Sequence, residues 1–273
     1  MAVNFLRRMR TKTKLAQEVI KHFPPHDIYI ENFFGAGGVF FNKPLAKYNF
    51  LNDNCKPLIE LFETAINKGE ELLEALEHSP YSQRLFNHFR DTSPDTCEFM
   101  KNDDVLRAVR FLYLSNYSFL GGGKMMHLHL NDNSKPALLK NLKKFLGSDY
   151  IKNTHFTSQD FRKFFDVVSF RHESEKQRSF LYSDPPYLET GNMYGEDFEK
   201  IKWKEQDVLD LFEANIKSKT RFAISEFNHP FILETAKKHN LNIIEIGERH
   251  DLGNRKTEIL ITNYECVDLF SML

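Results

Sequence analysis

The chain has 273 residues, which is enough for one large domain with an insertion or for two modest domains that each bury a core. Hydrophobic residues make up 41% and charged residues 27%, so the composition is that of a globular protein and excludes a disordered or fibrous chain. The formal net charge is −1, yet the charged residues within 7–14 (RRMRTKTK) are all positive. That run indicates either a solvated N-terminal face or a basic arm that contacts nucleic acid.

Cysteine usage and hydropathy narrow the cellular setting. The three cysteines show no CxxC or Cys/His spacing, which argues against a disulfide scaffold and a zinc site, and no metal is expected. The sequence shows neither a signal-peptide pattern nor an apolar run of membrane-spanning length. We therefore expect a cytoplasmic protein without a membrane partner, either bacterial or from a phage in a bacterial host.

Short apolar runs recur along the chain and predict seven strands, at residues 27–34, 48–53, 153–158, 179–184, 220–227, 241–248 and 257–264. Helical spacing of apolar residues lies between many of them, at residues 12–23, 56–66, 205–216 and 230–239. Strand and helix in alternation predict an α/β fold with a mostly parallel, doubly wound sheet. Only RHDLGNRK separates the sixth strand from the seventh, so these two are expected to pair antiparallel as a hairpin.

The alternation breaks between the second and third strands, where helical patterns follow one another at residues 70–79, 81–90, 103–117 and 136–147. Because this insertion is too long for a loop, we predict a separate, mainly helical lobe at 61–150, and a principal domain formed by 1–60 and 151–273. Within the lobe, residues 118–134 (SFLGGGKMMHLHLNDNS) are predicted to be an exposed hairpin or a flexible finger.

A glycine-rich loop, ENFFGAGGVFF at residues 31–41, follows the first predicted strand and is expected to open a helix. Gly35, Gly37 and Gly38 would allow a ligand to approach the backbone closely at the strand ends, where open α/β sheets bind ligands. The loop lacks the full GxGxxG spacing and the Lys-Ser/Thr pair of a phosphate-binding loop. A tight turn without a ligand is the competing interpretation.

An acidic residue, Asp53, stands at the tip of the second predicted strand. An acid at this distance after a glycine loop is where α/β folds bind the hydroxyls of a ribose. Asp53 or Asn54 could equally cap the helix that follows. Glycine loop and acid together favour a ligand that contains a nucleoside.

The fourth predicted strand ends in SDPPY, residues 183–187. Asp184 lies at the strand edge where catalytic groups collect, and Pro185 and Pro186 contribute no backbone N–H, so the turn presents hydrogen-bond acceptors. Tyr187 adds a flat ring. Such a surface is complementary to a planar molecule with an NH₂ group, such as the edge of adenine or cytosine. Accepting the N–H bonds of the amine would localise its lone pair and make the nitrogen a nucleophile.

These motifs resemble those of the Dam-like, adenine-specific DNA methyltransferases, which use S-adenosylmethionine and have a Rossmann-like sheet. The family's catalytic string is matched without change, which implies catalytic roles for Asp184, Pro185, Pro186 and Tyr187. The family's cofactor loop, Glu-Pro-Phe-x-Gly-x-Gly, appears at residues 31–37 with only the proline replaced. By this resemblance the cofactor-binding residues are Lys12, Phe33, Gly35, Gly37, Asp53, Asp160 and Phe161.

Other parts of the resemblance are weaker. RRMRTK matches the family's N-terminal cofactor segment only at Lys12, while RKTEILITNYE resembles the family's ending and implies structural or loop-ordering roles for Glu258 and Asn263. In the lobe, RAVRFLYLSNYSF resembles the start of the DNA-reading region, but LGGGKMMHLHL replaces the signatures that follow it. A GATC target is therefore not implied. The predicted contacts to phosphates or bases are Arg8, Arg110 and Lys124.

The reaction implied by the resemblance is methyl transfer to the exocyclic amine of an adenine flipped out of duplex DNA. Because this amine is a poor base, Asp184 is expected to orient and polarise it as a hydrogen-bond acceptor, with the base stacked on Tyr187. Residues 189–198 are a predicted lid. The expected partners are double-stranded DNA and, in a restriction-modification pair, a cognate restriction enzyme, and the protein itself is expected to be a monomer or a weak dimer.

Three alternatives remain open at this point. The chain could methylate RNA adenine, the amine of cytosine or a protein amide, although Asn or Ser more often stands in place of Asp184 there. It could be a catalytically silent nucleic-acid-binding protein on the same fold. It could also be a nucleotide-dependent dehydrogenase, in which the terminal hairpin and the Asp-Pro-Pro-Tyr string would have no role.

Overall fold

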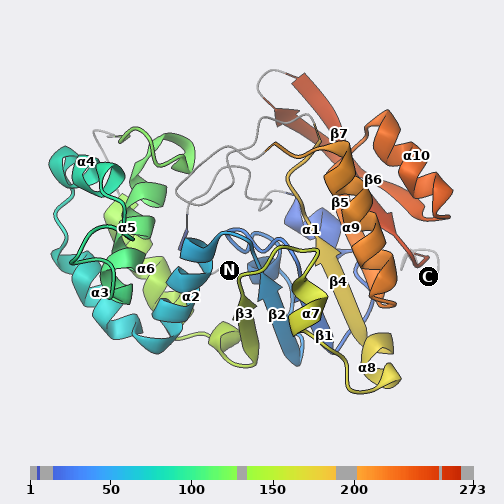
Figure 1. Cartoon of the computed structure of the whole chain (residues 1–273), viewed down its shortest axis with the longest axis horizontal. Helices are drawn as coiled ribbons and strands as arrows, with labels where there is room; N and C mark the ends of the chain where they lie inside the picture. The colour runs from blue at the N-terminus through green and yellow to red at the C-terminus, as the bar shows by residue number, and fades with distance from the viewer. Residues whose placement is uncertain (1–4, 7–14, 128–133, 189–201, 252–253, 266–273) are drawn as a thin grey trace.

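The computed structural model describes residues 5–6, 15–127, 134–188, 202–251 and 254–265, and in these parts seven strands form one sheet (Figure 1). The sheet order is β3-β2-β1-β4-β5-β7-β6. Strands β1 to β5 pair parallel, whereas β7 lies antiparallel to both β5 and β6. The predicted α/β sheet with a terminal antiparallel hairpin is confirmed. The strand bounds are β1 Ile28–Glu31, β2 Tyr48–Asn52, β3 Thr154–Thr157, β4 Ser179–Ser183, β5 Arg221–Phe227, β6 Asn242–Asp251 and β7 Asn254–Thr262.

Helices cover both faces of the sheet because side chains along each strand alternate between two buried clusters. Ile28 and Ile30 of β1 point into a cluster with α7 (Phe164–Val167), α9 (Glu205–Lys217) and α10 (Pro230–Lys238). Tyr29, between them, points to the opposite face, which α1 (Ala16–Ile20) and α2 (Lys56–Asn67) cover. A further short helix, α8 (Glu173–Gln177), precedes β4. A strand buried on both faces is what a parallel sheet requires, which explains the continuous apolar runs of the sequence.

The insertion between β2 and β3 is mainly helical, as predicted, and gathers beside α2 on the left of Figure 1. One buried cluster runs from the sheet through Phe62 of α2 to Phe86 and Leu142 of the inserted helices. The insertion therefore shares its core with the sheet, and the predicted division at residues 61 and 150 stays a prediction. Its elements are α3 (Gly69–His78), α4 (Gln83–Asp91), α5 (Asp104–Tyr117), η3 (Phe119–Gly121), α6 (Ser134–Leu146) and η4 (Asp149–Ile151).

The glycine loop does not open an α-helix, contrary to our expectation. It leads into one turn of 3₁₀-helix, η2 (Phe40–Asn42), before the chain enters β2. Phe40 and Phe41 are buried in the cluster on the face of the sheet to which Tyr29 points. Pro44 follows the turn and cannot continue a helical hydrogen-bond ladder. The buried packing of these two phenylalanines, and not a helical repeat of apolar residues, therefore determines the conformation of this segment.

The predicted finger is partly described. Residues Ser118 and Met126 pair in an antiparallel bridge, and Phe119 N–H donates to the carbonyl of Met125 at 2.9 Å. Phe119 and Met125 are exposed. A short hairpin-like base is therefore present, and residues 128–133 lie outside the described part.

Candidate active site

The carboxyl ends of the parallel strands bring the predicted site residues to one edge of the sheet. The glycine loop follows β1, Asp53 follows β2, Asp160 follows β3, and Asp184 follows β4. The chain runs from β1 outward to β2 and β3 and then crosses back to β4 on the other side of β1, which makes the β1–β4 boundary the switch point where such sheets bind ligands. Because β7 runs the other way, its first residues also reach this edge.

Two glycines of the loop are required by its backbone. Gly35 and Gly37 have φ values of +53° and +69°, a region that side chains disfavour. A Cβ on Gly37 would lie 2.4 Å from Cε2 of Phe41, so this glycine is needed for packing. A Cβ on Gly35 would meet nothing within 4 Å. Gly35 therefore borders open space, where a ligand can approach the backbone.

Asp53 holds the glycine loop and the start of α2 together. Its Oδ2 accepts from the Gly35 N–H at 2.8 Å, and its Oδ1 accepts from the Cys55 N–H at 2.9 Å. The contact with the Cys55 N–H, at the start of α2, resembles the helix-capping role that was considered for Asp53. Contact of Asp53 with a ribose stays a prediction.

Asn52, which the sequence analysis did not single out, joins the loops after β1, β2 and β3. Its Nδ2 donates to the carbonyls of Asn32 at 3.1 Å and Gln159 at 2.9 Å, and its Oδ1 accepts from the Gln159 N–H at 3.0 Å. Asn52 is fully buried. The sequence did hold one signal for Asn52: it is a polar residue at the end of an apolar strand, next to Asp53.

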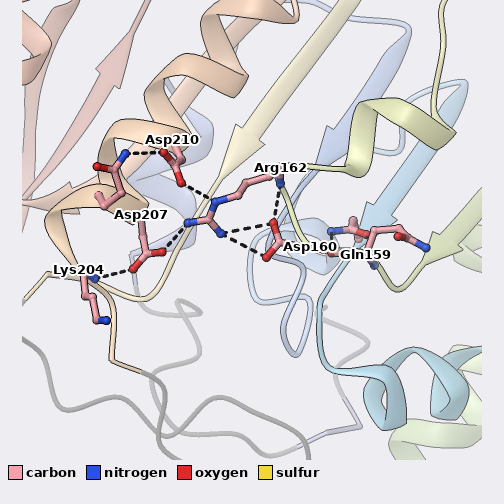
Figure 2. Close-up of polar contacts among 8 residues, drawn as sticks. Gln159, Asp160, Arg162, Lys204, Asp207 and Asp210 are labelled. Carbon is pink, nitrogen blue, oxygen red and sulfur yellow. Dashed lines mark hydrogen bonds and ion pairs between the residues drawn. The ribbon is translucent and has the colours of Figure 1, made fainter.

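Phe33 and the Asp160–Phe161 pair meet at the β3 side of the edge, as predicted for cofactor contacts. The rings of Phe33 and Phe161 have centroids 5.3 Å apart. The carboxylate of Asp160 accepts from the backbone N–H of Arg162 at 2.9 Å and from its guanidinium (Figure 2). Their contact with the cofactor stays a prediction.

The catalytic string leaves β4 as an extended turn with Asp184 half-buried at its start. The hydroxyl of Tyr187 lies 2.9 Å from Asp184 Oδ1 and 2.9 Å from Glu258 Oε1 of β7. The ring of Tyr187 meets Phe227 edge-on, with centroids 4.6 Å apart, and the residue is only 6% exposed. The hydroxyl is thus in position to hold Asp184. The stacking of a base on this ring stays a prediction.

Burial and the neighbouring acids keep Tyr187 protonated. Desolvation, followed by the charges of Asp184 and Glu258, raises the pKa of the Tyr187 hydroxyl well above its usual value. The same causes, with Asp184 the leading charge, raise the pKa of Tyr182 well above its usual value. Tyr182 contacts Ser225 Oγ at 2.9 Å. Tyr187 therefore acts as a neutral hydroxyl between two carboxyl groups over the whole working pH range.

Three further glutamates lie at this edge and are almost fully buried: Glu31, Glu226 and Glu258. Glu31 Oε2 accepts from the Tyr29 hydroxyl at 2.9 Å. Lys43 lies over the Tyr29 ring at 4.1 Å, and burial lowers its pKa to about 8 while Glu31 opposes that shift. These carboxyl groups bring acceptor oxygens to the edge, which suits a ligand that carries amine donors.

Of the three predicted DNA contacts, one is exposed, one is buried and one lies outside the described residues. Lys124 is exposed at the base of the finger. Arg110 is only 4% exposed and its Nε donates to the Phe89 carbonyl at 2.8 Å, so it supports α4 from inside the insertion and we no longer propose it as a DNA contact. A buried arginine on a helix has the same sequence pattern as an exposed one, so the burial of Arg110 could not be predicted. Arg8, Lys12 and the predicted lid lie outside the described residues.

Among the residues that the structure describes, no group of three or more His, Cys, Asp or Glu side chains is arranged to hold a metal ion. The helices described there include none long and apolar enough to cross a membrane.

The known proteins that this chain resembles agree with the class of site that the geometry indicates. The chain is 26% identical over 190 residues to the DNA adenine methylase of Escherichia coli (strain K12), covering 67% of this chain and 64% of that protein. It is 25% identical over 275 residues to the DNA adenine methylase of Salmonella typhi, covering 96% and 95%. It is 22% identical over 281 residues to the modification methylase StsI of Streptococcus sanguinis, covering 93% and 42%. The chain thus spans less than two thirds of the first and third of these relatives.

Among solved structures, a putative methyltransferase from Streptococcus mutans in complex with SAH is 9% identical, with a TM-score of 0.39, and the match covers 93% of this chain and 97% of that one. A family model described as D12 class N6 adenine-specific DNA methyltransferase matches residues 11–252, most of the chain. The family predicted from residues 184–187 and the glycine loop is thereby confirmed: the chain belongs to the D12 class N6 adenine-specific DNA methyltransferases.

Proposed function

We propose that the protein transfers a methyl group from S-adenosylmethionine to the exocyclic amine of adenine in duplex DNA. The observation that supports this most strongly is the Asp184 carboxylate at the end of β4, held by the Tyr187 hydroxyl at 2.9 Å and adjacent to the strand that carries the glycine loop. Family membership supports the same reaction.

The residues present fit S-adenosylmethionine. Gly35 leaves its backbone open to a ligand, and Asp53, Asp160 and the Phe33–Phe161 rings provide acceptors and flat surfaces for a nucleoside. The cofactor also carries an amine, and the carboxyl groups at this edge provide acceptors for amine donors. When bound, it supplies an electrophilic methyl group, so no metal is needed for the transfer.

Asp184 is proposed to orient the target amine. Pro185 and Pro186 have no N–H, so the turn offers only acceptors to the adenine edge. A carboxylate can accept from more than one donor, so Asp184 can accept from the amine while Tyr187 holds it. Orientation and preorganised hydrogen bonding are expected to supply most of the rate, with loss of one such contact costing on the order of 10²–10³-fold. Because the amine is out of reach inside a duplex, the base must be flipped.

DNA reading is proposed for the helical insertion, with Lys124 at the exposed base of the finger as one phosphate contact. A restriction enzyme as partner and a monomeric or weakly dimeric state remain predictions. The name of the StsI relative, a modification methylase, is the observation that favours a restriction-modification setting.

The test is to incubate the protein with S-adenosylmethionine and, in parallel, with unmethylated duplex DNA or RNA, digest each to nucleosides, and identify methylated bases by mass spectrometry. We expect N6-methyladenine from DNA. A methylated base from RNA alone, or methylcytosine from DNA, would replace the proposal by one of the alternative methyltransferases. S-adenosylmethionine binding without any methylated base would indicate a silent binding protein.

A further inference from the structure

The last two strands of the sheet continue well beyond its carboxyl edge. The final pair between β5 and β7 joins Phe227 to Glu258. Strands β6 and β7 go on pairing with each other as far as Asp251 and Asn254. At about 3.4 Å per residue, this two-stranded extension reaches about 14 Å past the end of β5. Figure 1 shows it rising on one side of the carboxyl edge, with the helical insertion on the other side. We call this extension, residues 248–251 and 254–257, the β6–β7 ribbon.

One face of the ribbon is turned toward the catalytic string. Because side chains alternate along a strand, Lys256 shares a face of β7 with Glu258, and Arg255 lies on the opposite face. Glu258 contacts the hydroxyl of Tyr187 at 2.9 Å. The Nζ atom of Lys256 lies 5.3 Å from the centre of the Phe227 ring, which in turn meets Tyr187 edge-on. We call the face with Lys256 the inner face of the ribbon.

Lys256 is a half-buried cation whose charge is not matched by an acid of the described chain. No carboxylate of the described residues forms an ion pair with it. Arg255, on the opposite face, pairs with Glu248 at 3.4 Å. In the register of β6 and β7, the position opposite Lys256 is held by another basic residue, Arg249. The inner face therefore has positive charge available for an anion outside the protein, whereas the charge of Arg255 is balanced.

A basic stretch of the sequence ends beside the base of the ribbon. Gly247 directly precedes the ribbon in β6, and a Cβ built on it would lie 3.8 Å from Cδ2 of Leu15. Leu15 directly follows the run RRMRTKTK, in which every charged residue is positive. The chain thus passes the base of the ribbon immediately after a basic run, which adds to the attraction of this side of the edge for an anion.

Duplex DNA is the anion that suits this position. It carries one phosphate charge for about every 1.7 Å of its axis, and its major groove admits a two-stranded ribbon. An adenine that reaches Asp184 must leave the helix, and the backbone on either side of it follows toward the carboxyl edge. Lys256 lies at that edge, because the rings of Phe227 and Tyr187 connect it to the carboxylate of Asp184.

We propose that the inner face of the β6–β7 ribbon contacts the phosphate backbone of DNA beside the flipped adenine, and that Lys256 binds one of these phosphates. This role rests on the proposed function, because the DNA is its substrate. It adds a DNA contact from the last two strands of the sheet, on the side of the carboxyl edge opposite to the insertion. The duplex is then held on both sides of the flipped base.

The test is a titration of a labelled, unmethylated DNA duplex of mixed sequence with the full chain, followed by fluorescence anisotropy at several salt concentrations. S-adenosylhomocysteine is present throughout, because it does not react. Lys256→Met keeps the length of the side chain and removes its charge. We expect its Kd for the duplex at low salt to rise by about three- to tenfold, and the slope of log Kd against log salt to fall by about 1. Lys256→Arg should restore most of both values.

Arg255→Met is the matched control, because it removes the same charge at the next position of β7 but on the opposite face. We expect its Kd for the duplex to stay within about twofold, since an exposed ion pair such as Arg255 with Glu248 contributes little. Calorimetry should give wild-type S-adenosylhomocysteine binding for both variants, which shows that both are folded.

Wild-type DNA binding by Lys256→Met at every salt concentration would overturn the proposal, as would an equal loss of DNA binding in Arg255→Met. Loss of S-adenosylhomocysteine binding in Lys256→Met would also overturn it, because Lys256 would then support the packing of the edge and not the DNA. Each of these results leaves the proposed function standing. A wild-type protein that binds no duplex DNA would instead contradict the proposed function itself.

Discussion

Two polar residues of one sequence motif lie at opposite edges of the sheet and have opposite roles. Glu258, in the middle of β7 and paired with the last residue of β5, is fully buried at the carboxyl edge of the sheet and contacts the hydroxyl of Tyr187. Asn263, just past the end of β7, accepts from the Phe222 N–H and donates to the Thr220 carbonyl, each at 2.8 Å, at the amino edge. Because β7 is antiparallel to β5, its chain runs from the carboxyl edge at Glu258 to the amino edge at Asn263, five positions later.

The same contrast holds for the two edges as a whole. At the amino edge, Arg178 pairs with Asp27 at 2.9 Å, and Arg221 donates to the carbonyls of Pro25 and Gln177. These contacts close turns and face no candidate ligand residue. We therefore expect changes at the amino edge to affect stability alone, and changes at the carboxyl edge to affect binding or rate as well.

The largest effect on stability is expected at the glycine loop, from Gly37→Ala. Its Cβ would overlap Phe41 at a positive φ, so we expect a loss of about 3 kcal/mol in the free energy of unfolding and weaker S-adenosylhomocysteine binding. Gly35→Ala is the matched control, since it adds backbone strain without overlap and should cost only about 1 kcal/mol. Urea unfolding measures both. Equal losses would show that Phe41 does not set the loop.

Glu258→Ala is the next largest change and acts on the rate. Loss of the contact to Tyr187 should loosen Asp184 and lower kcat by roughly 10- to 100-fold, with the KM for S-adenosylmethionine within about threefold. Glu258→Gln keeps an oxygen for the Tyr187 hydroxyl and should recover most of the rate. A similar loss of rate in Glu258→Gln would mean that shape and hydrogen bonding are not what Glu258 provides.

Asn263→Ala should act on stability only. Removing two backbone-directed hydrogen bonds at the amino edge is expected to lower the free energy of unfolding by about 1–2 kcal/mol, without changing kcat. Thermal or urea unfolding together with a methylation assay checks this. A fall in kcat with unchanged stability would break the contrast between Glu258 and Asn263.

His26 gives the smallest expected effect, through pH. Burial, the leading cause, lowers the pKa of His26 from 6.5 to about 4 in the folded protein, so the unfolded chain binds the proton first as the pH falls. Its contribution to stability is present above pH 6.5 and is lost as the pH falls toward 4, by about 1 kcal/mol between about pH 7 and pH 5.5. His26→Gln should remove that part of the pH dependence of unfolding. An unchanged pH dependence would show that His26 titrates normally.

Sequence patterns predicted the sheet well because its buried strands are defined by local alternation and short apolar runs. The hairpin of β6 and β7 followed from the shortness of its connection. The segment after the glycine loop was predicted wrongly as a helix opening, because packing of Phe40 and Phe41 from another layer decides its shape. Local periodicity cannot report such a contact.

The candidate site was predictable where one motif supplies a residue and not where distant segments meet. Asp184 and Asp53 were identified from their position at strand tips. The contact of Tyr187 with Glu258 spans 71 residues, and Trp203 meets Phe33 and Phe161 only in the folded chain. Arg110 showed the reverse error, since its charge in sequence suggested a surface and the fold buried it.

The central claim is that the end of β4 performs the chemistry while the ends of β1 to β3 bind the cofactor. The most direct measurement compares the wild type and Asp184→Ala in one preparation each, by calorimetry with S-adenosylhomocysteine and by single-turnover methylation of DNA. We predict an unchanged Kd within about threefold and a rate lower by roughly 10³-fold or more in Asp184→Ala. A variant that still methylates adenine at a comparable rate would contradict the account.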